Sequence, residues 1–175
     1  MNCAETLRQS GFTGQITVLT KEDTVPYDRT LLSKALAGGD ASKWALRSPE
    51  YLKEADIDYK FNAGVFSVNT KVKKVITVRG KHIHYDKLLI ATGSNVWVPP
   101  VKGLERNRRG KVTPKNVFFL RTNTDQAGIK EAAATAKKVV VIGGSFVGSE
   151  CAASLKQQFK DNIEIDIING DKCPF

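Results

Sequence analysis

The chain is poor in cysteine, and its few cysteines show no pattern typical of redox or metal chemistry. Cys3, Cys151 and Cys173 are widely scattered, form no CxxC pair and match neither a zinc site nor a disulfide framework. We therefore expect structural thiols in a reducing compartment. His82 and His84 would share one face of a strand, but no third ligand accompanies them, so we predict no metal site.

Long apolar runs are also missing. No stretch approaches the roughly 20 apolar residues that a membrane-spanning helix requires, so we predict no membrane span. The N-terminal stretch MNCAETLRQSGF has neither the apolar core of a signal peptide nor the composition of a transit peptide. Either the protein is cytosolic, or its address segment lies outside this chain.

Acidic residues are outnumbered by basic ones, and the formal net charge is +9. Such a charge raises nucleic acid or an acidic protein as a partner, but it also suits anionic cofactors. Much of the excess falls in residues 102–115, KGLERNRRGKVTPK. This segment lacks the interleaved aromatic residues of a single-strand binder, so we expect a solvated loop and disfavour nucleic acid.

Hydrophobic periodicity divides the chain into short helices and strands. A helix ending at Ser10 feeds a strand over residues 15–22, and Ser48 with Pro49 begins another helix. The continuous apolar stretch 87–94 predicts a strand buried on both faces of a parallel sheet. Further expected elements are a short helix over 30–36, an antiparallel meander over 58–70, 73–80 and 81–86, a strand at NVFFL (116–120) and a helix over 125–136.

A complete βαβ unit follows near the C-terminal end. The pattern predicts a strand over 138–142, a glycine-rich turn, a helix over 146–159 and a strand over 163–168. The turn reads GGSFVG, a variant of the GxGxxG turn that binds dinucleotides. The free N–H groups of a helix N-terminus and its positive dipole end attract phosphate. We therefore predict nucleotide binding at this turn.

Each position of the turn has a separate task. Gly143, followed by Gly144, suits the tight turn out of the strand, and Gly148 suits close packing of helix on strand. Ser145 stands where the usual middle glycine lets the backbone approach a pyrophosphate. It adds bulk, and it also adds a hydroxyl donor.

The residue that would bind the ribose lies at the end of the second strand. An acid is usual there, but this chain has Asn169, with Asp171 two residues later. An amide can hydrogen-bond a 2′-hydroxyl and repels a 2′-phosphate less than a carboxylate does. The choice between NADH and NADPH therefore stays open.

Several separated stretches resemble one enzyme family. They are ETLRQSGFTGQITVLTKEDTVPYDRTLLSK, YDKLLIATGS, NVFFLRTNTD and VVVIGGSFVGSE. Together they are similar to the FAD-dependent pyridine nucleotide oxidoreductases, within the ferredoxin-reductase-like branch and nearest to the apoptosis-inducing factor 3-like group. The likeness covers essentially the whole chain, with the motifs in the family's order.

The resemblance implies an α/β fold and a central fragment of a longer enzyme. Two Rossmann-like domains would be present in part, with the antiparallel meander in the first. Residues 1–121 would belong to an FAD-binding domain whose first strand and phosphate turn lie outside the chain. Residues 122–175 would form the first half of an NAD(P)H-binding domain. In this reading the fragment alone is inactive.

The resemblance also assigns cofactor-binding residues. Glu22, at the end of the expected strand ITVLTKE, corresponds to the acid that holds the FAD ribose, and Val65 to a backbone contact with the adenine. Arg29 and Lys34 correspond to basic residues near the pyrophosphate and the flavin. Thr92 and Gly93 correspond to a turn that packs on FAD. The expected NAD(P)H residues are Gly143, Gly144, Ser145, Gly148 and Asn169.

Three residues receive catalytic assignments from the resemblance: Lys34, Glu150 and Phe146. Phe146 and Glu150 match positions between the flavin and the nicotinamide, and Glu150 matches the partner of Lys34. A lysine beside the flavin would favour its reduced form, and the acid would fix that lysine. We therefore predict that Lys34 and Glu150 approach salt-bridge distance.

The chain has no CxxxxC where a disulfide reductase of this superfamily carries its redox pair. The expected acceptor is therefore external: a ferredoxin or Rieske-type protein, a quinone or oxygen. The resemblance admits a cytoplasmic or a mitochondrial location. A basic nucleic-acid-binding or apoptosis-related signalling module without turnover is the alternative function.

Overall fold

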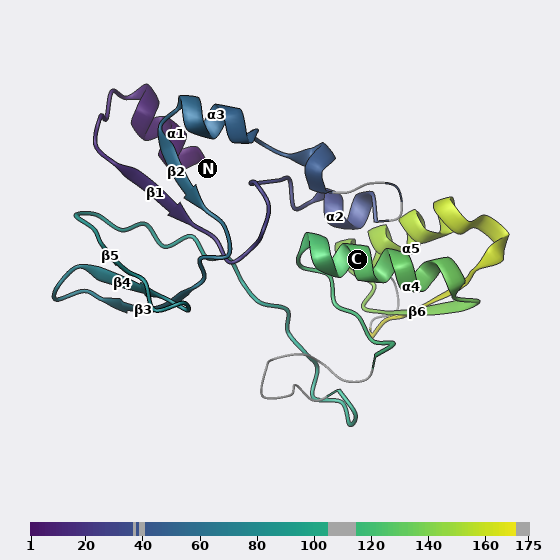
Figure 1. Cartoon of the computed structure of the whole chain (residues 1–175). Coiled ribbons are helices and arrows are strands. Elements are labelled where there is room, and N and C mark those ends of the chain that lie inside the picture. Colours follow the sequence, from purple (N-terminus) through teal and green to yellow (C-terminus); the bar gives the residue numbers. More distant parts are fainter. Residues whose placement is uncertain (37, 39–40, 105–114, 171–175) are drawn as a thin grey trace. The chain divides into compact units, whose positions relative to one another are not determined.

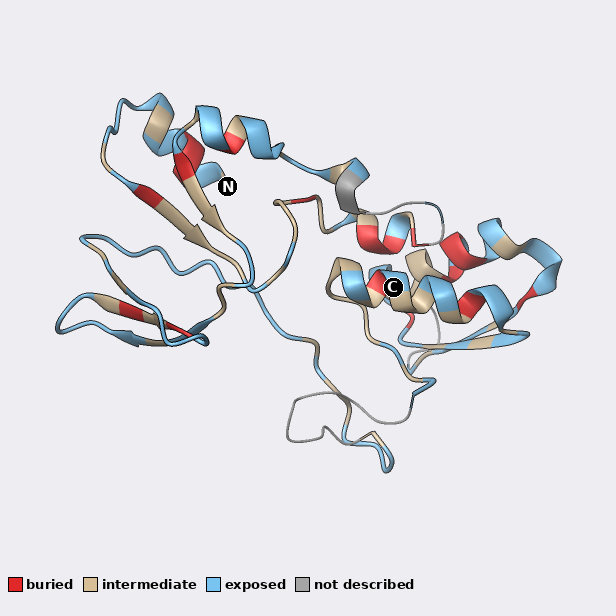
Figure 2. Ribbon diagram, in the orientation of Figure 1, coloured by how far each residue is buried: buried red, intermediate tan, exposed pale blue. Residues whose placement is uncertain are grey.

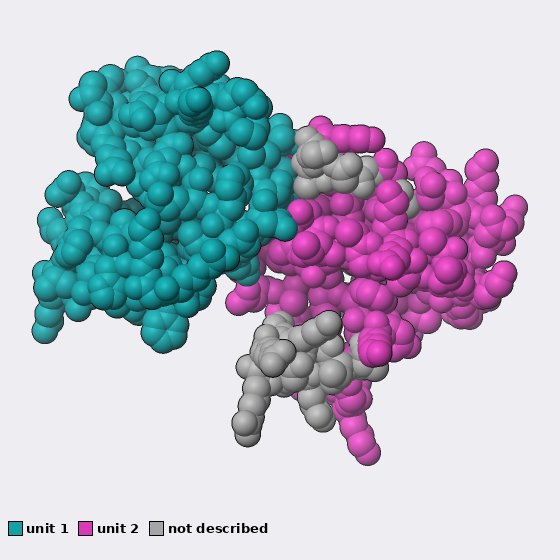
Figure 3. Space-filling view, viewed as in Figure 1, with its two compact units in different colours: residues 1–27, 45–93 teal, residues 28–44, 94–175 magenta. Residues whose placement is uncertain are grey.

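The computed structural model of the chain describes residues 1–36, 38, 41–104 and 115–170. It divides into two compact units, each made of two separate stretches of sequence (Figure 3). Unit 1 comprises Met1–Tyr27 and Ala45–Gly93, and unit 2 comprises Asp28–Trp44 and Ser94–Phe175. Of the sequence features above, most of the basic segment, Asp171 and Cys173 lie outside the described residues.

Unit 1 contains a two-stranded parallel sheet with two helices. The strands are β1 (Ile16–Leu19) and β2 (Ile57–Lys60), and the helices are α1 (Asn2–Gln9) and α3 (Pro49–Glu54) (Figure 1). Helix α3 begins as expected, because the Ser48 side chain accepts a hydrogen bond from the Tyr51 N–H. The core of this part is formed by Ala4, Ile16, Leu52 and Ile57.

A separate three-stranded antiparallel sheet completes unit 1. Its strands are β3 (Val65–Asn69), β4 (Lys74–Thr77) and β5 (His82–His84), in the order β3-β4-β5. The expected meander is thus confirmed for these strands. Its first expected stretch is divided, however, because residues 58–60 belong to β2 and pair with β1 in parallel.

The strand expected over residues 87–94 is absent from the described structure. No strand is formed there, and Leu89 and Ile90 are 66% and 67% exposed. An apolar strand buried on both faces needs a pairing strand on its edges and cover on its faces, and the described residues supply neither. The expectation for 116–120 is wrong in the same way, since this stretch also forms no strand.

Unit 2 holds the predicted βαβ unit. Strand β6 (Lys138–Ile142) and helix α5 (Phe146–Phe159) have the expected bounds. Strand β7 (Glu164–Ile168) begins one residue late and pairs with β6 in parallel, Lys138 opposite Glu164. The unit also contains α2 (Leu31–Lys34), α4 (Asn123–Thr135) and the 3-10 helices η1 (Ala41–Trp44) and η2 (Lys160–Asn162).

Helices α2, α4 and α5 carry most of the described buried residues of unit 2 (Figure 2). The core joins Leu36, Ala133, Leu155 and Ile163. Helix α4 begins two residues earlier than expected because Thr122 forms a capping box with Asp125. Among the described residues, no helix is long and apolar enough to cross a membrane.

Candidate cofactor-binding site

The glycine-rich turn between β6 and α5 has the geometry that its sequence predicts. Gly143 has a φ of 110°, a conformation that side-chain-bearing residues rarely adopt, and its N–H donates to the Ile168 carbonyl over 2.9 Å. A Cβ atom on Gly148 would lie 2.0 Å from the Gly143 carbonyl oxygen. The turn is therefore so tightly closed that only glycine fits at position 148.

Asn169 lies against this turn. A Cβ atom on Gly144 would come within 2.8 Å of the Asn169 Cγ atom, so the amide side chain rests directly over the Gly144 backbone. The end of β7 is held there by the Gly143 hydrogen bond to Ile168. The predicted ribose-binding position and the predicted phosphate turn are thus neighbours in space. The part Asn169 plays in binding stays a prediction.

Helix α5 begins directly after Ser145. Ser145 is its N-cap, with an extended backbone, and its side chain makes no capping hydrogen bond. The next two residues are exposed, Phe146 by 69% and Val147 by 53%. The glycine cradle and the helix N-terminus fit a dinucleotide phosphate, because the backbone can approach such a ligand closely and the free N–H groups of a helix N-terminus attract it.

Lys34 and Glu150 form the predicted salt bridge. The Lys34 Nζ and Glu150 Oε1 atoms are 2.7 Å apart, and both residues belong to unit 2. The lysine side chain is 52% exposed, whereas that of Glu150 is 27% exposed. The hydrogen bond from Lys34, and after it one from Ser33, lowers the pKa of Glu150 below its ordinary value.

Sequence reasoning missed the second partner of Glu150. The Ser33 hydroxyl donates to Glu150 Oε2 over 2.5 Å, and Ser33 is only 5% exposed. Nothing in the stretch LLSK distinguishes this serine from any other small helical residue. The one available signal was its position next to Lys34.

Helix α2 is anchored to the rest of unit 2 by buried contacts. The buried Gln126 of α4 donates from Nε2 to the Ala35 carbonyl over 3.1 Å and to the Leu32 carbonyl over 3.4 Å. Leu36, two residues after the helix, is fully buried in the core. Arg29, before the helix, donates to the Arg121 carbonyl. Lys34 is therefore presented by a helix held in place on several sides.

Unit 1 brings two other predicted residues near each other. The Asn62 N–H donates to the Glu22 carbonyl over 3.0 Å, and the Ala63 N–H donates to the Thr20 carbonyl over 2.7 Å. The segment that leads into Val65 therefore runs beside Glu22. The Glu22 carboxylate accepts a hydrogen bond from the Tyr27 hydroxyl over 2.7 Å.

The remaining predicted FAD residues lie at the end of unit 1. Thr92 and Gly93 are both exposed, and Gly93 has a positive φ of 65°. The structure thus supplies the turn backbone expected there. The roles of both residues stay predictions.

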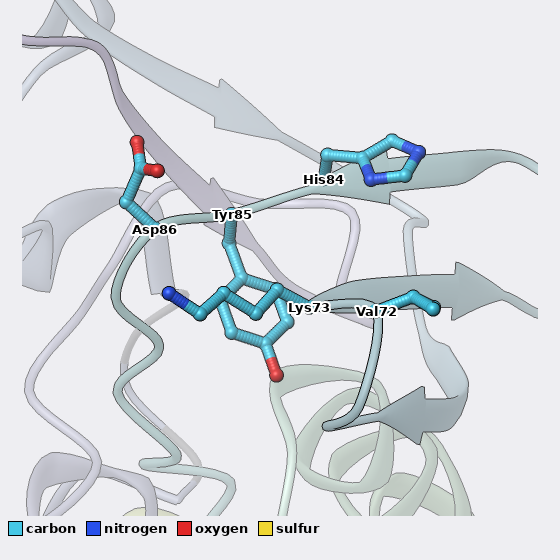
Figure 4. Close-up of a pocket in the computed structure, with 5 residues that line it drawn as sticks. All are labelled: Val72, Lys73, His84, Tyr85 and Asp86. Atoms are coloured by element: carbon cyan, nitrogen blue, oxygen red, sulfur yellow. The ribbon is translucent and has the colours of Figure 1, made fainter.

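Two further features of the described chain take no part in these sites. A surface hollow at the β3–β4 turn is lined by Val72, Lys73, His84, Tyr85 and Asp86, none of which is a predicted site residue (Figure 4). Burial, and then the nearby Glu150 charge, raises the pKa of Cys151 to about 11. This thiol is therefore protonated at neutral pH and is a poor nucleophile.

The parallel βαβ unit with its glycine cradle defines a dinucleotide-binding protein. The chain belongs to the pyridine nucleotide-disulphide oxidoreductase family, whose model matches residues 1–170. Members of this family use FAD and NAD(P)H. The expected family, the α/β fold and the antiparallel meander are thereby confirmed.

Individual relatives agree with this assignment. Human apoptosis-inducing factor 3 is 35% identical over 173 residues, which are 99% of this chain and 26% of that protein. Rhodocoxin reductase from Rhodococcus erythropolis is 32% identical, over 98% of this chain and 38% of that protein. The chain therefore spans between about a quarter and two fifths of the length of these relatives.

Solved structures show the same fold. The ferredoxin reductase for the CYP199A2 system from Rhodopseudomonas palustris superposes with a TM-score of 0.81 at 28% identity, over 94% of this chain and 38% of that one. The reductase in the covalent putidaredoxin reductase–putidaredoxin complex gives 0.78 at 31% identity, again over 94% and 38%.

Proposed function

We propose that the chain is part of an FAD-dependent NAD(P)H oxidoreductase. The observation that carries the proposal is the 2.7 Å pair between Lys34 and Glu150. Glu150 lies near the start of α5, the helix that follows the glycine-rich turn, two residues after Gly148. The Lys34 ammonium group therefore lies close to the start of α5, the helix that we propose binds the nicotinamide dinucleotide, and it would face the bound flavin there.

Two sets of residues would hold the cofactors. FAD would be bound through Glu22, Arg29, Lys34, Val65, Thr92 and Gly93, and NAD(P)H through Gly143, Gly144, Ser145, Gly148 and Asn169. The FAD-binding domain would cover residues 1–121 and the NAD(P)H-binding domain residues 122–175. When bound, FAD supplies the chemistry of accepting a hydride from the nicotinamide.

The protein side chains would orient the charged groups of the site and compensate their charge. The Lys34 ammonium group would favour the electron-rich state of the flavin, and Glu150 would keep that ammonium in one place and balance its charge. The exposed ring of Phe146 would cover the nicotinamide site and exclude water. Each of these three residues would touch either a cofactor or a side chain that itself touches a cofactor.

The electron acceptor would be an external iron–sulfur protein. This proposal is supported by the names of two relatives, rhodocoxin reductase and putidaredoxin reductase, the latter solved with putidaredoxin. A ferredoxin or a Rieske-type protein would suit, with a quinone or oxygen as the other acceptors. The cytoplasm and the mitochondrion are both proposed compartments.

Nucleotide binding and flavin binding test the proposal. NADH added to the chain should shift the amide NMR signals of residues 143–148 and 169, whereas signals of the β3–β5 sheet should stay unchanged. The chain alone should bind FAD weakly and turn over no substrate. The longer gene product should carry the visible absorbance of flavin, and its purification without flavin would overturn the proposal.

A further inference from the structure

Ser33 is a buried hydroxyl with two acceptors within reach. Its Oγ atom is 2.5 Å from Glu150 Oε2 and 3.3 Å from the Thr30 carbonyl oxygen. A serine hydroxyl carries a single proton, so it donates to one acceptor at a time. The shorter contact, to a charged acceptor, is also the stronger type of hydrogen bond.

The two oxygens of Glu150 have different partners. Oε1 accepts from Lys34 Nζ over 2.7 Å, and Oε2 accepts from Ser33 Oγ over 2.5 Å. A carboxylate bonded at one oxygen alone can rotate about its last bond, but one bonded at both is fixed. Neighbouring residues of α2 thus determine both the place and the plane of this carboxylate.

We propose that Ser33 is a positioning residue, which orients the Glu150 carboxylate and thereby fixes the direction of the Lys34 ammonium group. This inference rests on the proposed function, because the direction of Lys34 matters only if the ammonium faces a cofactor. Ser33 touches no cofactor in this proposal and acts through Glu150.

The surroundings of Ser33 support its role as a positioning residue. Gln126 binds the carbonyls of Leu32 and Ala35, on either side of the Ser33–Lys34 pair in sequence. Leu36 is buried in the core beyond them. The backbone of Ser33 is therefore held from α4, so its hydroxyl is a fixed reference point and not a mobile surface group.

The Thr30 carbonyl is a second acceptor for the Ser33 hydroxyl, so the loss of Glu150 and the loss of Ser33 have different consequences. If the Glu150 carboxylate is neutralised, the Ser33 hydroxyl can donate to the Thr30 carbonyl and remains satisfied despite its burial. If the Ser33 hydroxyl is removed, Glu150 keeps Lys34 alone and regains its rotation. Substitution of Ser33 should therefore disturb Glu150 more than substitution of Glu150 disturbs Ser33.

The first test is an NMR titration of the Glu150 carboxyl carbon in the chain and in Ser33→Ala, Ser33→Thr and Ser154→Ala. In the described part of the chain, Glu150 interacts with Lys34 of α2 and with Cys151 of α5, and Asp28 interacts in turn with Lys34. Ser33→Ala should raise the pKa of Glu150 toward its ordinary value. Ser33→Thr, which keeps a hydroxyl, should restore the low pKa.

Ser154→Ala is the matched control. Ser154 is another buried serine of unit 2, and it is not among the two hydrogen-bond donors to Glu150 in the described part of the chain. It should leave the pKa of Glu150 unchanged. An unchanged pKa in a folded Ser33→Ala variant would overturn the proposal. If that variant fails to fold, Ser33→Cys, with a weaker donor, allows the same comparison.

The second test uses the flavin-loaded longer protein. Ser33→Ala should slow hydride transfer roughly tenfold, the scale of one hydrogen bond to a charged group, without changing the affinity for NADH. An unchanged rate, or a loss confined to NADH affinity, would overturn the positioning role. Failure of the longer protein to bind FAD would overturn the proposed function. The carboxyl titration needs no cofactor, so it tests the contact between Ser33 and Glu150 independently of that result.

Discussion

The Lys34 Nζ and Glu150 Oε1 atoms lie 2.7 Å apart, although the two residues are 116 positions apart in the sequence. Their contact ties a short helix from the first part of the sequence to the helix that follows the glycine-rich turn. The sequence alone, by resemblance, predicted this pair. Its geometry leads to a pH-dependent contribution to stability.

Replacement of Lys34 by Met should make the chain less stable near neutral pH and have little effect in acid. The Lys34 hydrogen bond is the first cause of the lowered pKa of Glu150. A lowered folded-state pKa stabilises the protein above the ordinary carboxyl pKa, and this contribution disappears as the pH falls through the folded value. Thermal unfolding between pH 7 and pH 3 measures the difference between the two proteins.

The matched control for this measurement is Lys130→Met, which removes an exposed lysine from α4 in the same unit. It should show no comparable dependence on pH. If the effect of Lys34→Met were constant over this range, the pair would contribute nothing through the charge of Glu150.

Substitution of Gly148 by Ala should destabilise unit 2 and abolish nucleotide binding. The added Cβ would lie 2.0 Å from the Gly143 carbonyl oxygen, which is backbone and cannot move without opening the turn. Overpacking of this kind costs about 1–3 kcal/mol. Urea unfolding should reveal the loss, while Gly38→Ala, where a Cβ meets nothing within 4 Å, should unfold like the parent chain.

Asn169→Asp should shift nucleotide preference toward NADH. The new carboxylate can accept hydrogen bonds from a ribose but repels the 2′-phosphate of NADPH, so we expect the NADH-to-NADPH affinity ratio to rise by at least about tenfold. Calorimetric titration with both nucleotides measures the ratio. Asn162→Asp, the same charge change in η2, should leave it unaltered. Equal losses for both nucleotides would show that Asn169 does not face the 2′ position.

Cys151 should react with iodoacetamide much more slowly than the exposed Cys3 at neutral pH. Only the thiolate is nucleophilic, and burial raises the pKa of Cys151 to about 11. Mass spectrometry after timed alkylation compares the two sites. Modification of Cys151 should accelerate above pH 9, and rapid reaction at pH 7 would contradict its raised pKa.

The net charge of +9 provides the test of the alternative function. We expect a labelled DNA or RNA duplex to show no stable binding to the chain by fluorescence anisotropy, even at low salt. Binding that is tight at low salt and falls steeply as salt is added would instead favour the basic nucleic-acid-binding module.

The sequence predicted best where structure is determined locally. The bounds of β6 and α5 follow from a β-branched run, a glycine turn and an amphipathic stretch that adjoin one another. Residues 87–94 and 116–120 have equally apolar sequences, but a strand also needs a partner, which composition does not reveal. Local patterns therefore gave the βαβ unit and failed for strands that depend on distant pairing.

In the candidate site, too, the residues that depend on local structure could be predicted from local patterns and those that depend on distant contacts could not. Gly143 and Gly148 could be predicted because each satisfies a backbone requirement of the turn itself. Lys34 and Glu150 came from family resemblance. Ser33 and Gln126 escaped both, because a serine and a glutamine within helices have no distinctive pattern, and their importance comes from acceptors far away in the chain.

The assignment of residues 28–44 to unit 2 has a practical consequence for protein engineering. This stretch is enclosed in sequence by the two stretches of unit 1, yet it supplies Leu36 to the unit 2 core and both donors to Glu150. A chimera that replaces only residues 94–170 with those of a relative would pack the transplanted segment against Leu36 of this chain and not against the relative's own residue at that position. Successful exchange of cofactor preference between relatives should therefore require both stretches to be transplanted together.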